Sequence, residues 1–321
     1  MGLGAARVDA VKNGLVAFCF PGQGSLATGM GREMAAAVPE AMDVFERASV
    51  AAGLDLRQLC FEGSEEELVE TEVQQPALVA TSLAVLAAIR ARGIKPDFVV
   101  GHSVGEFAAL AAAGALKVEE AIGLVRERGL AMAEAARNNP GSMAAILGLD
   151  DEVVERICRR IVNVWPANYN CPGQIVVSGE NHAVEQACED AEGEGARRAV
   201  KLRVSGAFHS PLVARAADRL RPALERVKFA EPTAPFMSTV TARIENAKRM
   251  GPLLVDQLTA PVRFTQAAQS LLREGVQTFV EVGPGNVLSG LVKRIDRNAN
   301  TISVSTPEGL QKLEETLASA S

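Results

Sequence analysis

The stretch Val99-Val100-Gly101-His102-Ser103-Val104-Gly105-Glu106 decides the fold prediction. The apolar run 98–100 predicts a buried strand, and the alanine-rich run 107–113 predicts a helix directly after the turn. Between them lies Gly-x-Ser-x-Gly, in the strand–turn–helix context that a nucleophile elbow requires. The glycines let strand and helix approach closely, and the sharp turn presents the serine at its tip. We therefore predict that Ser103 is a nucleophile.

Apolar and amphipathic segments alternate on both sides of this elbow. We expect strands at 15–20, 98–100, 235–240, 278–282 and 301–304, with helices between them. A capping box at Ser64 and Glu67 predicts the start of a helix over 64–73, and Gln74-Gln75 separates it from a second helix over 76–92. Such alternation is typical of a mostly parallel sheet with helices on both faces.

The middle of the chain has a different order of elements. From 142 to 204 the pattern is strand, helix, strand, strand, helix, strand, which is the ferredoxin-like arrangement. The expected fold class is therefore α/β with an inserted subdomain. We predict a discontinuous large domain, 1–138 and 206–321, and a small domain over 139–205.

Composition and charge argue against several classes of protein. Of the 321 residues, 48% are apolar and 22% charged, as in soluble globular proteins. The net charge of −6 does not suit a surface that binds nucleic acid or an anionic membrane. No apolar run approaches the roughly 18 residues that a membrane span needs. The five cysteines lack Cys-x-x-Cys spacing, so free thiols in the cytoplasm are expected, without a metal site.

A serine nucleophile needs a general base, and the chain contains three histidines. His102 precedes Ser103 directly, so its side chain is expected to point away from the hydroxyl. His182 opens a helix of the small domain and is expected at the surface. His209 lies in a loop before a helix, where catalytic groups often occur. We therefore predict that His209 is the base.

Seven motifs, in order along the chain, resemble those of the malonyl-CoA:acyl-carrier-protein transacylases, a family that includes the acyltransferase domains of fatty-acid and polyketide synthases. The resemblance spans about residues 15–295 and implies an α/β-hydrolase-like large domain with a ferredoxin-like insert. The matching segments are Phe20-Pro21-Gly22-Gln23-Gly24-Ser25, Gln75-Pro76-Ala77-Leu78, Gly101-His102-Ser103-Val104-Gly105-Glu106, Arg128-Gly129, Asn168-Tyr169-Asn170-Cys171-Pro172-Gly173-Gln174, Ala207-Phe208-His209 and Glu281-Val282-Gly283-Pro284-Gly285.

The resemblance implies a role for each matching residue. Ser103 would take the malonyl group, His209 would act as general base and acid, and the backbone N–H groups of Gln23 and Val104 would bind the oxyanion. Arg128 matches the arginine that holds the malonyl carboxylate, for which a guanidinium fork is well suited. The other expected site residues are Gln257, whose backbone carbonyl would support the histidine, Gln75 and Asn170 at the acyl pocket, and Phe208, whose ring would disfavour methylmalonyl.

The expected activity is transfer of malonyl from malonyl-CoA to the phosphopantetheine thiol of an acyl-carrier protein, by a ping-pong route and without cofactors. A serine esterase or thioesterase, a methylmalonyl-selective acyltransferase and a non-catalytic docking domain are the alternatives. We expect a monomer that binds neither nucleic acid nor membrane. Some basic residues should steer the acidic carrier, the candidates being Arg156, Arg159, Arg160, Arg197, Arg198, Lys201, Lys293 and Arg294.

Overall fold

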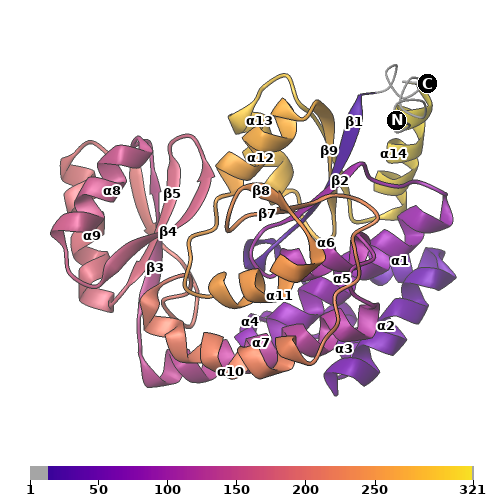
Figure 1. Ribbon diagram of the computed structural model, residues 1–321, viewed down its shortest axis with the longest axis horizontal. Helices are drawn as coiled ribbons and strands as arrows, with labels where there is room; N and C mark the ends of the chain where they lie inside the picture. The colour runs from indigo at the N-terminus through magenta and orange to yellow at the C-terminus, as the bar shows by residue number, and fades with distance from the viewer. Residues whose placement is uncertain (1–13, 320–321) are drawn as a thin grey trace.

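A six-stranded sheet forms the centre of the larger part of the molecule (Figure 1). The computed structural model describes residues 14–319, so the ends of the predicted large domain, 1–13 and 320–321, lie outside the described residues. The strand order is β10-β9-β1-β2-β7-β8, parallel except for the β7–β8 pair. The mostly parallel sheet is thus confirmed. Its strands are β1 (Leu15–Phe20), β2 (Phe98–Gly101), β7 (Phe236–Ser238), β8 (Arg243–Glu245), β9 (Val276–Val282) and β10 (Asn300–Val304).

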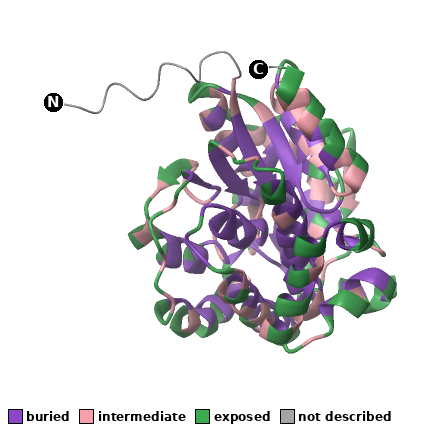
Figure 2. Cartoon of the chain, turned by 90° about the vertical axis from the view of Figure 1, so that its right-hand side faces the viewer, coloured by how far each residue is buried: buried purple, intermediate pink, exposed green. Residues whose placement is uncertain are grey.

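Alternating side chains of β1 enter two different cores. Val16, Phe18 and Phe20 join the large core on one face, whereas Ala17 and Cys19 join the core on the other face. Figure 2 shows these strands buried at the centre of the molecule, with exposed residues along the outer helices. The first core packs under α2 (Pro39–Ala52), α5 (Thr71–Ala91), α6 (Gly105–Ala112), α7 (Val118–Asn138) and α10 (Ala214–Glu225), and the second under α12 (Phe264–Arg273) and α13 (Val287–Ile295).

A second, four-stranded sheet lies beside the first (Figure 1). Its order, β4-β5-β3-β6, is antiparallel throughout, as the ferredoxin-like prediction requires. Helices α8 and α9 cover one face and share a separate core with it. The domain boundaries at 138/139 and 205/206 stay a prediction. The elements are β3 (Ser142–Leu147), α8 (Asp151–Arg160), β4 (Val164–Cys171), β5 (Gln174–Gly179), α9 (Asn181–Gly193) and β6 (Arg198–Lys201).

The predicted break at Gln74-Gln75 is wrong. Helix α5 runs unbroken through these glutamines with Pro76 inside it, and the break falls at Glu70. A proline inside a helix leaves the carbonyl four residues earlier without its donor. Here that carbonyl belongs to Glu72, and Arg126 Nη1 donates to it at 2.6 Å. A side chain of α7 therefore supplies the bond that the proline cannot.

Among residues 14–319 one helix, α5, is long and apolar enough by length and composition to cross a membrane, yet 83% of its most apolar window is buried inside the protein. Its composition is explained by packing, since almost every residue from Gln74 to Ile89 is buried.

The other helices are α1 (Arg32–Ala37), α3 (Leu56–Glu62), α4 (Glu65–Val69), α11 (Ala247–Asp256) and α14 (Pro307–Ser319), with 3-10 turns η2 (Gln23–Ser25) and η3 (Pro211–Val213).

The two sheets are joined through the edge strand β4. Val262, in the segment between α11 and α12, bridges to Asn168 in parallel register. Tyr169 N–H donates to the carbonyl of Val262 at 2.8 Å, and Val262 N–H donates to the carbonyl of Ala167 at 2.8 Å. These bonds attach the small sheet to the segment of the large domain that also contacts His209.

Candidate active site

Ser103 occupies the tight turn between β2 and α6. Its φ of 52° lies in the left-handed region, which costs energy for a residue with a Cβ and is often found at functional sites. A Cβ on Gly101 would lie 2.2 Å from the backbone nitrogen of Glu106, and one on Gly105 would lie 2.1 Å from the carbonyl oxygen of Phe20. Both glycines are therefore required by sterics, as the elbow prediction assumes.

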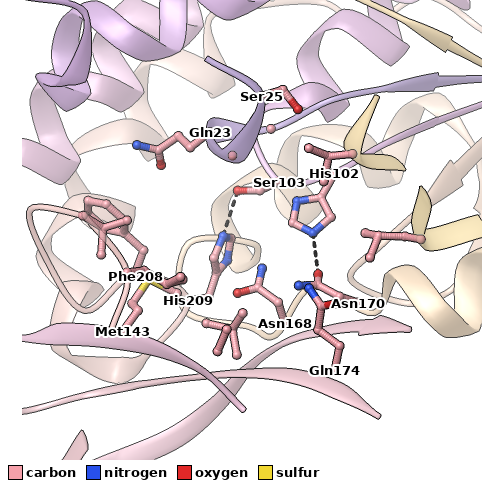
Figure 3. A pocket seen from close by; sticks show the side chains of 18 of the residues that line it. Gln23, Ser25, His102, Ser103, Met143, Asn168, Asn170, Gln174, Phe208 and His209 are labelled. Carbon is pink, nitrogen blue, oxygen red and sulfur yellow. Dashed lines mark hydrogen bonds between the residues drawn. The ribbon is translucent and has the colours of Figure 1, made fainter. Parts of the chain in front are cut away.

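His209 makes the contact that a general base needs. Its Nε2 lies 2.7 Å from Ser103 Oγ (Figure 3). On the opposite edge of the ring, Nδ1 lies 2.9 Å from the carbonyl oxygen of Gln257 and 3.2 Å from that of Ala260. Because carbonyl oxygens only accept, Nδ1 must hold the ring proton, and Nε2 is left with a lone pair directed at the serine hydroxyl.

The surroundings of His209 keep it neutral. Burial is the main cause and the nearby Arg128 guanidinium the next, and together they lower the pKa of His209 to about 3. The imidazole is therefore unprotonated at neutral pH and can accept the serine proton. His209 also has a positive φ, 57°, so both members of the serine–histidine pair have strained backbones.

Arg128 lies behind the serine and is completely buried. Its Nη1 donates to Gln75 Oε1 at 2.7 Å, and its Nη2 donates at 3.1 Å both to Ser103 Oγ and to Gln257 Oε1. Its Nε has no hydrogen-bond partner among the described residues. Burial lowers the pKa of Arg128 to about 10, so the side chain remains a cation at neutral pH.

His102 lines the same cavity as Ser103 but has a different hydrogen-bond partner (Figure 3). Its Nε2 lies 2.9 Å from Asn170 Oδ1, which links the elbow to strand β4 of the small sheet. Burial lowers the pKa of His102, so this ring is also neutral. His182 has a side chain that is 78% exposed, which agrees with the expected surface position.

A cavity of about 320 Å³ lies between the two sheets, next to the serine. Of the predicted site residues, Gln23, Ser103, Asn170, Phe208 and His209 line it. Val104, Gln75, Arg128 and Gln257 do not, because they are buried behind it. The predicted residues therefore form two groups. One group lines the cavity, and the other is buried behind it and contacts Ser103 and His209 of the first group.

Several residues at this site were not predicted from the sequence. Ala260 supplies the second carbonyl to His209, Gln74 accepts a hydrogen bond from Gln23 Nε2 at 2.5 Å, and buried Glu106 contacts the Gln257 side chain. A signal existed for Glu106, since it is a lone acid in a helix of apolar residues. No local signal marks Ala260. Within residues 14–319, no three His, Cys, Asp or Glu side chains are grouped so that they could hold a metal ion.

A serine at an elbow of an α/β sheet, bonded to a neutral histidine, defines an enzyme class that transfers acyl groups through an acyl-serine. A family model described as "Acyl transferase domain" matches residues 17–318, and the chain belongs to this family. The resemblance to the malonyl-CoA:acyl-carrier-protein transacylases that the seven motifs indicated is thus confirmed.

Individual relatives agree with this assignment. The chain is 46% identical, over 94% of its length and 97% of the relative's, to the malonyl CoA-acyl carrier protein transacylase of Bacillus subtilis. The solved structure of the transacylase from Coxiella burnetii has a TM-score of 0.93 at 38% identity, covering 95% of this chain and 98% of that one. A malonyl-transacylase solved in complex with a type II polyketide acyl-carrier protein has a TM-score of 0.91 at 40% identity, covering 94% of this chain and 99% of that one.

Proposed function

We propose that this protein transfers a malonyl group from malonyl-CoA to the phosphopantetheine thiol of an acyl-carrier protein, through a malonyl ester on Ser103. One observation is central to the proposal. Ser103 Oγ lies between a lone pair that can take its proton, on His209 Nε2, and a buried cation that can bind a carboxylate, on Arg128. The family and the names of the relatives support the same reaction.

In the first half-reaction, Ser103 Oγ attacks the thioester carbonyl while its proton moves to His209 Nε2. Negative charge develops on the carbonyl oxygen, where the backbone N–H groups of Gln23 and Val104 are proposed to bind it. Each such donor is worth about 3 kcal/mol in the transition state. Collapse of the intermediate breaks the C–S bond, and the departing sulfur of CoA takes the proton from His209.

The second half-reaction runs the same steps with a new thiol. His209 Nε2 accepts the proton of the phosphopantetheine thiol, and the thiolate attacks the malonyl ester. When the C–O bond breaks, the proton returns from His209 to Ser103 Oγ. No metal or redox group takes part in this proposal. The carbonyls of Gln257 and Ala260 hold the imidazole in the required tautomer and stabilise its cationic form in both halves.

Arg128 is proposed to select a carboxylated acyl group. Its Nη2 donates to Ser103 Oγ at 3.1 Å, so the cation lies within hydrogen-bond distance of the atom to which the acyl group will be attached. Its Nε–H group donates to no acceptor among the described residues. A malonyl carboxylate would supply both acceptors and a negative charge in direct contact with the guanidinium, whereas an acetyl group would supply neither.

Phe208 is proposed to restrict the α-carbon of the acyl group. Its ring is buried, lines the cavity and precedes His209 directly. A bulky ring at this position leaves less space for the additional methyl of methylmalonyl, although one methyl is worth only about 1–3 kcal/mol. Asn170 lines the same cavity, while Gln75 acts behind it by binding Arg128.

The carrier protein is proposed to dock at the mouth of the cavity. Three of the candidate basic residues already have acidic partners away from it: Arg159 with Glu155, Arg160 with Glu194 and Lys201 with Glu185. Arg294 instead donates at 2.6 Å to Gln174, a cavity residue. Arg203 lines the cavity itself but pairs with Glu65 at 3.6 Å. We favour Arg294 as a contact for an acidic carrier, and a cytoplasmic monomer as the working form.

Intact-protein mass spectrometry after brief exposure to malonyl-CoA tests the proposal. The wild type should gain a malonyl adduct that carrier protein removes, and Ser103→Ala should gain none. Rapid release of CoA without an adduct would indicate hydrolysis and favour an esterase. If the wild type shows no adduct and releases no CoA, the enzymatic proposal is overturned and a docking domain is favoured.

A further inference from the structure

Glu106 is a fully buried carboxylate that the proposed mechanism does not use. It lies in the first turn of α6, three residues after the nucleophile. Its Oε1 accepts from the backbone N–H of Thr239 at 2.6 Å and from the Thr239 hydroxyl at 2.8 Å. Its Oε2 accepts from Gln257 Nε2 at 2.5 Å. The carboxylate therefore joins the turn after β7 to a residue that contacts the active site.

Gln257 is the residue through which Glu106 reaches the active site. Its side-chain oxygen accepts from Arg128 Nη2 at 3.1 Å, and its side-chain nitrogen also donates to the backbone carbonyl of Ser103 at 3.1 Å. Its backbone carbonyl is one of the two acceptors of His209 Nδ1. One glutamine thus contacts the nucleophile, the base and the cation.

Two acceptors, the Glu106 side chain and the Ser103 carbonyl, face the nitrogen of that amide and together favour one orientation. A carboxylate is an acceptor, so it must face the NH₂ group of Gln257, and the amide oxygen must then face Arg128. Arg128 is a donor only, so the opposite orientation would place donors against donors at the guanidinium. With glutamine at position 106, the Thr239 N–H would hold the new amide oxygen, so the new NH₂ group would face Gln257 Nε2 and favour the opposite orientation.

We propose that Glu106 is a positioning residue for malonyl recognition: it fixes the side-chain amide of Gln257, which in turn holds the Arg128 guanidinium against the site of the malonyl carboxylate. This inference rests on the proposed function. It predicts that loss of the Glu106 carboxylate weakens the loading of malonyl more than the loading of acetyl, because acetyl has no carboxylate for Arg128 to bind.

A matched control is available in Glu281, another buried carboxylate. It accepts from the backbone N–H groups of Leu288 and Ser289, and among the described residues it forms no hydrogen bond with Ser103, His209 or Arg128. Glu281→Gln therefore removes the same charge from an equally buried position without touching Gln257. A general effect of losing a buried carboxylate would appear in both variants.

The experiment measures kcat/KM for loading from malonyl-CoA and from acetyl-CoA in wild type, Glu106→Gln and Glu281→Gln. We expect Glu106→Gln to lower malonyl loading roughly tenfold or more, from the loss of a charge-dependent network, and to lower the malonyl-to-acetyl ratio. Glu281→Gln should leave that ratio unchanged. An unchanged ratio in Glu106→Gln, or an equal fall in both variants, would overturn the inference.

Two further variants cover the case in which Glu106→Gln does not fold. Glu106→Asp keeps the charge but is too short to reach Thr239 and Gln257 together, so its malonyl-to-acetyl ratio should also fall. Combining a Glu106 variant with Gln257→Met should cost no more than the larger single effect, because both act through one amide. Additive losses would contradict this route. Absence of malonyl loading in the wild type would instead refute the proposed function.

Discussion

At the scale of single residues, the activity proposed for the site depends on the protonation states of His209 and Arg128. His209 can act as a base only because two backbone carbonyls hold its Nδ1 proton and burial keeps the ring neutral. Arg128 is effective for a related reason, since a cation with few acceptors around it favours a ligand that supplies them. Both effects arise from tertiary surroundings and not from the residue types alone.

Arg128→Ala should exchange one acyl specificity for another. Removing the guanidinium removes the counterion of the malonyl carboxylate, so malonyl loading should fall about 100-fold or more. The penalty for binding acetyl disappears at the same time, so an acetyl adduct should appear after exposure to acetyl-CoA. Intact-protein mass spectrometry with both thioesters checks this, with Arg159→Ala as the surface control. A variant that still prefers malonyl would show that other groups bind the carboxylate.

The neutral state of His209 predicts how stability depends on pH. Its pKa in the folded protein, about 3, lies below the ordinary 6.5, so the unfolded chain binds more protons between these values. The stability that His209 contributes is therefore complete above pH 6.5 and is lost as the pH falls towards 3. Between pH 6.5 and 5 the loss should be about 2 kcal/mol.

Urea unfolding of wild type and His209→Gln at both pH values isolates this contribution. The comparison matters because burial raises the pKa of Glu106 to about 7, so that group contributes stability in the opposite direction as the pH falls. Glu106 is present in both proteins, so its contribution cancels when the pH dependence of the free energy of unfolding is compared between them. Equal acid sensitivity of the two proteins would show that His209 is not held neutral.

At the scale of elements, the elbow can tolerate no side chain at its second glycine. Gly105→Ala would place a methyl group 2.1 Å from a backbone oxygen of β1, which cannot move without breaking the sheet. We expect it to lower the free energy of unfolding by about 3 kcal/mol or more and to abolish loading. Gly123→Ala, in the middle of α7 with open space around it, should instead stabilise by about 0.5–1 kcal/mol. Thermal unfolding of the two variants tests the contrast.

The sequence predicted the elements whose signals are local. The elbow is marked by its own glycines, and the small sheet by the order of its strands. Helix α5 was divided wrongly because Pro76 normally ends a helix, and the bond that rescues it comes from Arg126, fifty residues further along the chain. The helix 56–62 and the three-residue strand β8 were missed, since short elements with mixed polarity have little periodicity.

The same distinction applies to the candidate site. Ser103 and Arg128 were proposed as nucleophile and carboxylate clamp, yet their direct contact at 3.1 Å depends on how α7 packs beneath the elbow. The carbonyl of Ala260 has no sequence signature, because every residue has a carbonyl. Glu106 is marked as a lone acid in an apolar helix, but no local pattern shows which amide it contacts. The roles that follow from the type of side chain could be predicted, whereas the hydrogen bonds that depend on how side chains are oriented in the folded protein could not.

At the scale of the whole molecule, charge at the mouth of the cavity should govern the encounter with the carrier. Arg294→Glu should raise the KM for carrier protein several-fold, because it places a negative charge where an acidic partner approaches. Arg159→Glu makes the same change in net charge on α8 and should have little effect. Steady-state transfer at several salt concentrations measures both. Malonyl loading in the absence of carrier reports any damage to the cavity.

The short outer strands bear on aggregation. Unpaired edges of a sheet invite other chains to add to them. Strand β8 offers only three residues, two of them charged, and β6 begins with Arg198 and ends with Lys201. On the opposite side of the small sheet, the bridge at Val262 already occupies backbone groups of β4. The contact that attaches the small sheet to the large domain thus also occupies backbone groups of β4 to which another chain could otherwise add.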